Sequence, residues 1–235
     1  MINTFIIINK EKEQERYNYI QNQIKNYNLD KTLNINYFNF IWGNEINSEI
    51  RNKYCKSDWS MRKHDRTMEK NPLSNGEISL FLNHLECLKN IKNTFNDGIF
   101  IILESDVIFK PNFNEDIIKI VKSLNYLNDW DIINIGEGTR DYLKNRGYPK
   151  SQPNIINNFY FYKENINSCI EGLIWNYKSI NKFLDYFDKT EDIDSPIDTK
   201  IDVLSTYIGN FNIHWLEPSL VNQGSFIKLF NSHLR

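Results

Sequence analysis

The sequence has little of several residue types, and each shortage excludes a class of protein. Its 235 residues include 3 cysteines, 9 glycines and 6 prolines, and alanine is absent. Cys55, Cys87 and Cys169 are odd in number, widely spaced and without a CxxC pair. We therefore expect neither a disulfide framework nor a zinc cage, and a reducing compartment suits this cysteine usage.

Long hydrophobic runs and an excess of one charge are also missing. The longest apolar stretches, such as 5–8 and 99–103, are far shorter than the roughly 20 residues that a membrane-spanning helix needs. No basic and then apolar leader follows Met1, so we expect a cytoplasmic protein without a transmembrane segment. The formal net charge is -2, with Lys and Arg scattered along the chain, which argues against nucleic acid as a partner.

The composition is typical of a folded globular protein. Hydrophobic residues make up 40%, aromatic residues 14% and charged residues 25% of the chain. Neither an internal repeat nor a second hydrophobic core is evident in the sequence. We therefore expect one domain over residues 1–235.

Hydrophobic patterns predict strands that alternate with helices. The predicted strands are 4–9, 34–42, 99–103, 130–135, 157–163 and 211–216, and the predicted helices are 10–27, 74–95, 111–127, 178–187 and 195–207. This alternation predicts an α/β fold with a single Rossmann-like, mainly parallel sheet flanked by helices.

The clearest helix begins at a capping box, in which Ser74 and Glu77 satisfy each other's free amide groups. An apolar stripe at helical spacing then continues to Phe95. The preceding stretch, 51–73, is rich in charge and has no clear period. We expect it to be a long functional loop or a disordered one.

Glu104 and Asp106 follow the most apolar strand of the sequence. In open α/β sheets, ligands bind beyond the carboxyl ends of the strands. Two carboxylates at i and i+2 suit Mg²⁺ or Mn²⁺ that bridges a diphosphate. The alternative is a solvated turn after a strand.

Two segments carry a resemblance to a known family. Residues 73–79 with Asn83 and His84, and the strand 101–109 that contains Glu104 and Asp106, resemble glycosyltransferase family 25. That family includes bacterial lipopolysaccharide galactosyltransferases and the collagen galactosyltransferases. Weaker matches are 6–10 with Arg16, 130–133, 196–198 and 218–223, and their order holds across almost the whole chain.

The resemblance implies a GT-A type nucleotide-sugar-binding fold with Mn²⁺ or Mg²⁺ as cofactor. It also implies transfer of a hexose, galactose or glucose, from a UDP-sugar to a hydroxyl of a glycan or protein acceptor, with inversion. Two positions depart from the family pattern: Ser105 replaces the central Asp of Glu-Asp-Asp, and Asn83 replaces a Ser. The acid missing at position 105 motivates an alternative hypothesis, a catalytically degenerate module that binds glycans or serves as a scaffold. A metal-dependent phosphohydrolase is a third hypothesis.

Asp198 and Asp202 are candidates for the base that deprotonates the acceptor hydroxyl. They lie at i and i+4, which places both on one helix face. The resemblance favours Asp198. Alternatively, Ser195 and Asp198 form a capping box with Pro196 at the first helical position.

Further candidates have weaker support. Arg16 could bind a uracil or a phosphate from the first strand–helix connection, or be a solvated helix charge. His84 lies on nearly the same helix face as Glu77 and could contact the donor or make a structural hydrogen bond. His214 or His233 could complete the metal site, although each is a lone histidine.

Tryptophans and long loops are candidates for contacts with the sugar, the uracil or the acceptor. A sugar or a uracil could stack on Trp42, Trp59, Trp175 or Trp215, although most buried tryptophans belong to the core. We expect loops, including 51–73 and 140–155, to recognise the acceptor.

Overall fold

The computed structural model describes residues 1–56, 73–138, 144, 147–164, 169–206, 209 and 211–231. The strands are β1 (Ile2–Ile7), β2 (Leu33–Phe38), β3 (Ile99–Glu104), β4 (Val107–Phe109), β5 (Ile132–Asn134), β6 (Asn154–Ile156), β7 (Phe159–Lys163), β8 (Gly172–Asn176), β9 (Ile213–Glu217) and β10 (Val221–Gln223). The α-helices are α1 (Gln14–Tyr27), α2 (Ser48–Tyr54), α3 (Asn75–Thr94), α4 (Phe113–Ser123), α6 (Tyr177–Thr190) and α7 (Ile197–Thr206). Among the described residues, no helix is long and apolar enough to cross a bilayer.

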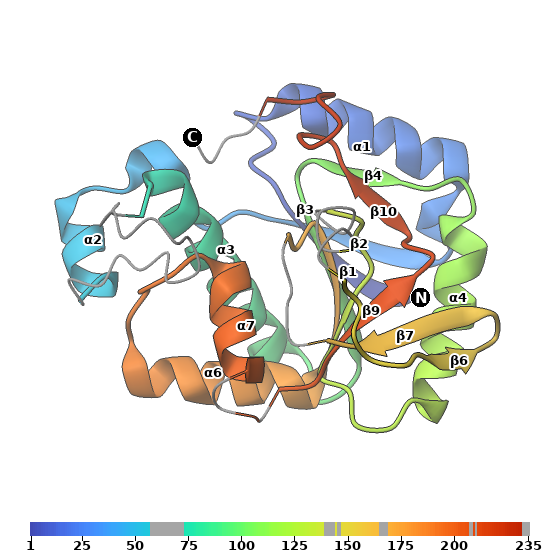
Figure 1. The fold of residues 1–235 in the computed structure, drawn as a ribbon. Coiled ribbons are helices and arrows are strands. Elements are labelled where there is room, and N and C mark those ends of the chain that lie inside the picture. Colours follow the sequence, from blue (N-terminus) through green and yellow to red (C-terminus); the bar gives the residue numbers. More distant parts are fainter. Residues whose placement is uncertain are drawn as a thin grey trace.

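Eight of the strands form one central sheet in the order β2-β1-β3-β8-β5-β9-β7-β6. Helices α3, α6 and α7 lie on one side of it and α1 and α4 on the other (Figure 1). The predicted α/β class with flanking helices is confirmed. The prediction of a mainly parallel sheet is wrong, because four of the seven strand pairs within the described residues are antiparallel.

The central antiparallel strand is β8, which the sequence patterns did not predict. The Glu104 amide at the end of β3 donates to the Glu171 carbonyl at 3.1 Å, just before β8 begins. The chain therefore enters β8 next to the carboxyl end of β3, so β8 runs antiparallel to β3. Its five residues start with Gly172 and continue directly into α6, so they have no turn residues around them that would mark a strand.

The core has a layer on each face of the sheet. On one face Phe81, Leu85 and Leu88 of α3 pack with Phe100 and Trp175, and all of these side chains are buried. On the other face the core includes Ile20 of α1, Phe113 and Ile117 of α4, and Ile101 and Ile133 of the sheet. Strand β3 contributes to both layers, which accounts for its uninterrupted apolar run.

Local signals set the ends of helix α3 as the sequence predicted. The Ser74 Oγ accepts from the Glu77 amide at 3.1 Å, and Glu77 Oε2 accepts from the Ser74 amide at 2.8 Å. The predicted capping box is thus confirmed. The helix then runs to Thr94, close to the predicted end.

The segment before α3 differs from the expected loop over 51–73. Helix α2 covers its first residues and is capped by Asn47, whose Oδ1 accepts from the Ile50 amide at 3.0 Å. Residues 57–72, including Trp59, lie outside the described part of the chain.

Strands β4 and β10 form a small antiparallel ribbon that packs against the main sheet. The contact is made over Gly172, because a Cβ at this position would lie 2.9 Å from Val221 Cγ2 and 3.0 Å from Ile135 Cγ1. The glycine thus lets the ribbon approach the main sheet. The ribbon in turn leads the chain after β10 towards the end of β3.

This close approach predicts a large effect for Gly172→Ala. The added methyl group overlaps two core side chains, so we expect the free energy of unfolding to fall by about 1–3 kcal/mol. Gly43→Ala is the matched control, because a Cβ there meets its nearest atoms at 3.6 Å. Its effect should stay within about 0.5 kcal/mol. Urea unfolding measures both, and equal losses in the two variants would contradict the packing argument.

Candidate functional site

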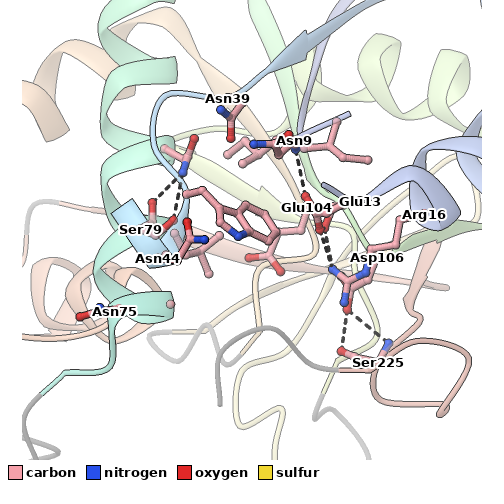
Figure 2. A pocket seen from close by; sticks show the side chains of 18 of the residues that line it. Asn9, Glu13, Arg16, Asn39, Asn44, Asn75, Ser79, Glu104, Asp106 and Ser225 are labelled. Carbon is pink, nitrogen blue, oxygen red and sulfur yellow. Dashed lines mark hydrogen bonds and ion pairs between the residues drawn. The ribbon is translucent and has the colours of Figure 1, made fainter. Parts of the chain in front are cut away.

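A cavity of about 480 Å³ opens at the carboxyl ends of β1 and β3. Its walls come from the segments after β1, β2 and β3, from the first turns of α1 and α3, and from the chain after β10. Figure 2 shows the charged side chains at one end and asparagines of the segment after β2 and of α3 at the other. The polar lining residues include Asn9, Glu13, Arg16, Asn39, Asn44, Ser74, Asn75, Ser79, Asn83, Glu104, Ser105, Asp106, Gln223 and Ser225.

Glu104 and Asp106 both line this cavity, so the structure brings the two predicted acids to one site. Glu104 is the last residue of β3, and Asp106 lies in the turn that leads to β4. Neither belongs to a solvated turn, since the Glu104 side chain is 12% exposed and Asp106 is 4% exposed.

Asp106 also anchors residues 224–231, which we call the C-terminal segment. Its Oδ2 accepts from the Ser225 hydroxyl at 2.5 Å and from the Ser225 amide at 3.2 Å. Its main-chain carbonyl accepts from the Gly224 amide at 2.7 Å. The C-terminal segment therefore forms the wall of the cavity next to Asp106.

Arg16 is a buried residue of the same site and not a solvated helix charge. Its Nη1 donates to Ser105 Oγ at 2.6 Å and to Glu13 Oε1 at 3.2 Å. Its Nη2 donates to the Asn231 carbonyl at 2.5 Å, and the guanidinium lies 5.5 Å from the centre of the Phe230 ring. Arg16 thus joins α1, the turn after β3 and the C-terminal segment.

Glu13 is a further residue of the site, which the sequence patterns did not identify. Its Oε1 accepts from the Ser105 hydroxyl at 2.6 Å, and its Oε2 accepts from the Asn9 amide at 2.9 Å. The i,i+3 spacing from Arg16 was the available signal, but it is common on solvated helix faces. Only the fold shows that both charges are buried.

His84 and Asp198 lie on the α3 and α7 side of the acids. His84 Nε2 is 3.7 Å from Glu104 Oε1, which is too long for a hydrogen bond. Burial lowers the pKa of His84 to about 3, partly opposed by the charge of Asp198, so the ring is neutral near pH 7. His84 therefore contacts the site as a neutral imidazole.

Negative charge is concentrated at this edge of the sheet. Burial first, and then the charges of Asp106 and Asp198, raise the pKa of Glu104 well above its usual range, and Arg16 partly opposes this. Burial also raises the pKa of Asp198, against the effect of hydrogen bonds from the Thr199 and Cys169 amides. The site therefore has a strong electrostatic preference for an added cation.

The predicted capping box at the start of α7 has a different hydrogen-bond pattern. Asp198 Oδ1 accepts from the Thr199 amide at 2.7 Å. The Ser195 hydroxyl donates to Asp194 Oδ1 at 3.0 Å. Asp202 follows one turn later on the same helix and is partly exposed, whereas Asp198 is the one close enough to raise the pKa of Glu104.

The structure does not bring His214 to the acids. His214 lies in β9, beside Ile133 of β5 and opposite Lys163 of β7. In the sheet order, β9 is three strands from β3, which corresponds to about 14 Å across the sheet. The prediction of His214 as a metal ligand beside Glu104 fails, because a lone histidine in a sequence gives no information about its strand order. His233 lies outside the described residues.

Without His214, the predicted metal site consists of Glu104 and Asp106, and these two carboxylates could supply some of the ligands of a divalent cation. In the described ranges, no group of three or more His, Cys, Asp or Glu side chains is arranged to hold a metal ion. Mg²⁺ is often held by only one or two carboxylates together with substrate phosphates and water. Glu104 and Asp106 match that chemistry, since burial and then the charges of Asp106 and Asp198 raise the pKa of Glu104, and a cation would offset the effect of those charges.

One family matches the sequence over most of its length. The model of glycosyltransferase family 25 (LPS biosynthesis protein) matches residues 1–201. The match includes every candidate site residue named above up to Asp198. No curated protein matches the chain.

The buried histidine of β9 predicts a pH dependence of stability. Burial and Lys163 lower the pKa of His214 from 6.5 to about 4. The unfolded chain therefore binds this proton below pH 6.5, while the folded protein binds it only below about pH 4, so stability falls as pH drops between these values. The loss attributable to His214 is at most about 3 kcal/mol.

We expect His214→Leu to lose less stability than the wild type between pH 7 and pH 4.5. Leu216→Val, a substitution on the same strand without a titrating group, is the control. Urea unfolding at a series of pH values measures the effect. A His214→Leu curve parallel to that of the wild type would show that this histidine does not couple protonation to unfolding.

Proposed function

The chain belongs to glycosyltransferase family 25, and we propose that it transfers a hexose, galactose or glucose, from a UDP-sugar to a hydroxyl group of an acceptor, with inversion. We also propose a GT-A type fold and a divalent cation such as Mn²⁺ at Glu104 and Asp106. The observation that carries the proposal is one cavity that has the acids and Arg16 at one end and asparagines at the other, with Trp42 among its lining residues (Figure 2).

The acidic end of the cavity suits the diphosphate of the donor. Glu104 and Asp106 would hold the cation, and Arg16 brings a positive charge to the same turn. When bound, the cation neutralises charge that develops on the leaving diphosphate. Both acids are held by the fold, Glu104 by its place at the end of β3 and Asp106 by Ser225.

The opposite end suits a nucleoside. Trp42 offers a flat aromatic face, and the side-chain amides of Asn39 and Asn44 can each donate and accept a hydrogen bond. The Trp42 amide donates to Glu45 Oε2 at 2.6 Å, which fixes the tryptophan backbone. This chemistry favours a heterocyclic base with both donors and acceptors on its edge, as in uracil.

Asn83, which replaces a Ser of the family pattern, supports this wall of the cavity. Its Oδ1 accepts from the Phe40 amide at 2.7 Å, and its Nδ2 donates to the Ile41 carbonyl at 2.7 Å. The side chain thus holds the chain just before Trp42. The substitution is consistent with a donor site that has kept its shape.

Asp198 is the leading candidate for the acceptor base. Its raised pKa makes the carboxylate a better proton acceptor than an exposed Asp, and it lies near enough to influence Glu104. The LPS biosynthesis named in the family description favours a glycan acceptor over a protein.

A catalytically degenerate glycan-binding or scaffold protein is the second candidate. The observation in its favour is Ser105, whose hydroxyl bonds Glu13 and Arg16 and offers no negative charge to a cation. The two candidates differ in their need for a donor. An active transferase binds the cation and the UDP-sugar together, whereas a scaffold need bind neither.

The donor proposal predicts thermal stabilisation that requires both ligands. UDP-galactose or UDP-glucose at about 100 times Kd, together with Mn²⁺, should raise the melting temperature by about 5–10 °C. Asp106→Asn should abolish this shift, because the amide keeps an oxygen for Ser225 but loses the charge. Ser225→Ala removes the hydroxyl but keeps the charge of Asp106 and the main-chain amide at position 225 that also donates to it, so this variant should retain part of the shift.

A thermal-shift screen of nucleotide sugars with and without Mn²⁺ measures these effects. The absence of a shift with every pair would reject the transferase proposal in favour of the second candidate. A shift that survives in Asp106→Asn would reject the assignment of the cation to that acid.

The base assignment predicts a loss of turnover without a loss of donor binding in Asp198→Asn. We expect UDP release in the presence of an oligosaccharide acceptor to fall about 10²–10⁴-fold. Asp202→Asn is the control one helical turn away and should remain near wild-type activity. A lower melting temperature with normal activity per folded molecule would instead assign Asp198 a purely structural role.

A further inference from the structure

Ser105 lies between two oppositely charged side chains, Glu13 at the N-cap of helix α1 and Arg16 in the first turn of that helix. Its Oγ accepts from Arg16 Nη1 at 2.6 Å and donates to Glu13 Oε1 at 2.6 Å. Glu13 Oε1 also accepts from Arg16 Nη1 at 3.2 Å. The three residues are 6–8% exposed, so the whole network is nearly shielded from water.

The charge balance of this network depends on Glu13. A buried guanidinium is costly unless a carboxylate compensates it, and the hydroxyl of Ser105 carries no charge. Glu104 and Asp106 flank Ser105, and Asp106 is bonded to Ser225. The carboxylate bonded directly to Arg16 therefore comes from the helix and not from the turn after β3.

The geometry also explains why a serine suits position 105. An Asp side chain at this position would point its carboxylate at Arg16 and at Glu13, the two partners of the Ser105 hydroxyl. Two buried carboxylates would then compete for one guanidinium, with like charges in contact. A serine instead bridges the pair with one donated and one accepted hydrogen bond.

We propose that Glu13 is a positioning residue of the donor site, which supplies through Ser105 the negative charge that position 105 lacks. Its Oε1 accepts a hydrogen bond from the Arg16 guanidinium and holds it at the turn that contains Glu104 and Asp106. Its Oε2 accepts from the main-chain amide of Asn9. Arg16 and Asn9 both line the cavity, so one carboxylate positions two of its walls. The assignment to a donor site rests on the proposed function, whereas the exchange of charge between positions 13 and 105 does not.

The test is a double-mutant cycle of Glu13→Gln, Ser105→Asp and the double variant. Glu13→Gln removes the charge and Ser105→Asp adds a second one, so each single variant should weaken UDP binding in the presence of Mn²⁺ by about tenfold. The double variant moves the carboxylate from the helix to the turn and should bind UDP within about threefold of the wild type. Glu15→Gln, an exposed acid in the same helical turn, should have no effect.

Two readouts separate positioning from a general loss of stability. Calorimetry gives the Kd of UDP with Mn²⁺, and NMR of the ¹⁵N-labelled protein detects the guanidinium signals of Arg16, which persist only while its hydrogen bonds slow exchange with water. These signals should disappear in Glu13→Gln and return in the double variant. Independent effects that add up in the double variant, by either readout, would overturn the proposal.

Failure of the proposed function and failure of the role of Glu13 give different results. If the wild type binds no UDP, the proposed function and the donor-site role of Glu13 both fail, while the Arg16 signals still report whether the charge can move between positions 13 and 105. If the wild type binds UDP but the double variant is not rescued, only the role of Glu13 fails.

Discussion

Burial of negative charge at the end of β3 is the constraint on which the site depends. The hydrophobic sheet fixes where Glu104 lies, and burial, together with the nearby charges of Asp106 and Asp198, raises its pKa. Such a cluster is costly to maintain in a folded protein without compensation. Arg16 and the amide and hydroxyl of Ser225 provide part of that compensation, and the divalent cation that we propose for this site would add to it.

The two helical layers place different chemistry on each side of this charge. Helix α1 packs on one face of the sheet and brings Glu13 and Arg16 to the turn after β3. Helices α3 and α7 pack on the other face and bring the neutral imidazole of His84 and the carboxyl of Asp198. The core is therefore what sets the distances between groups that are far apart in the sequence.

The sequence was informative where a signal is local. The apolar run of β3, the capping box of α3 and the position of Glu104 and Asp106 at a strand end were all predicted correctly. Strand β8 was missed because it is short, begins with a glycine and continues directly into a helix. That omission accounts for two of the four antiparallel pairs, and the other two involve β6 and β7.

Tertiary contacts explain the other differences at the site. Glu13 bonds a residue 92 positions away, and Ser225 bonds one 119 positions away, so no spacing rule could identify either partner. His214 shows the reverse problem, because a chemically suitable side chain was predicted to join a site from which its strand is separated. Predictions that rest on residue type alone fail when the order of strands in the sheet decides.

The bond from Arg16 to the carbonyl of Asn231 has a consequence for the growing chain. The two residues are 215 positions apart, and ribosomes add about 5–20 residues per second. Helix α1 thus leaves the ribosome roughly 10–40 s before the segment that completes the cavity wall around Arg16. During translation the nascent protein can form its first helix and the β1–β3 pairing long before the cavity wall around Arg16 is complete, because that wall needs the carbonyl of Asn231.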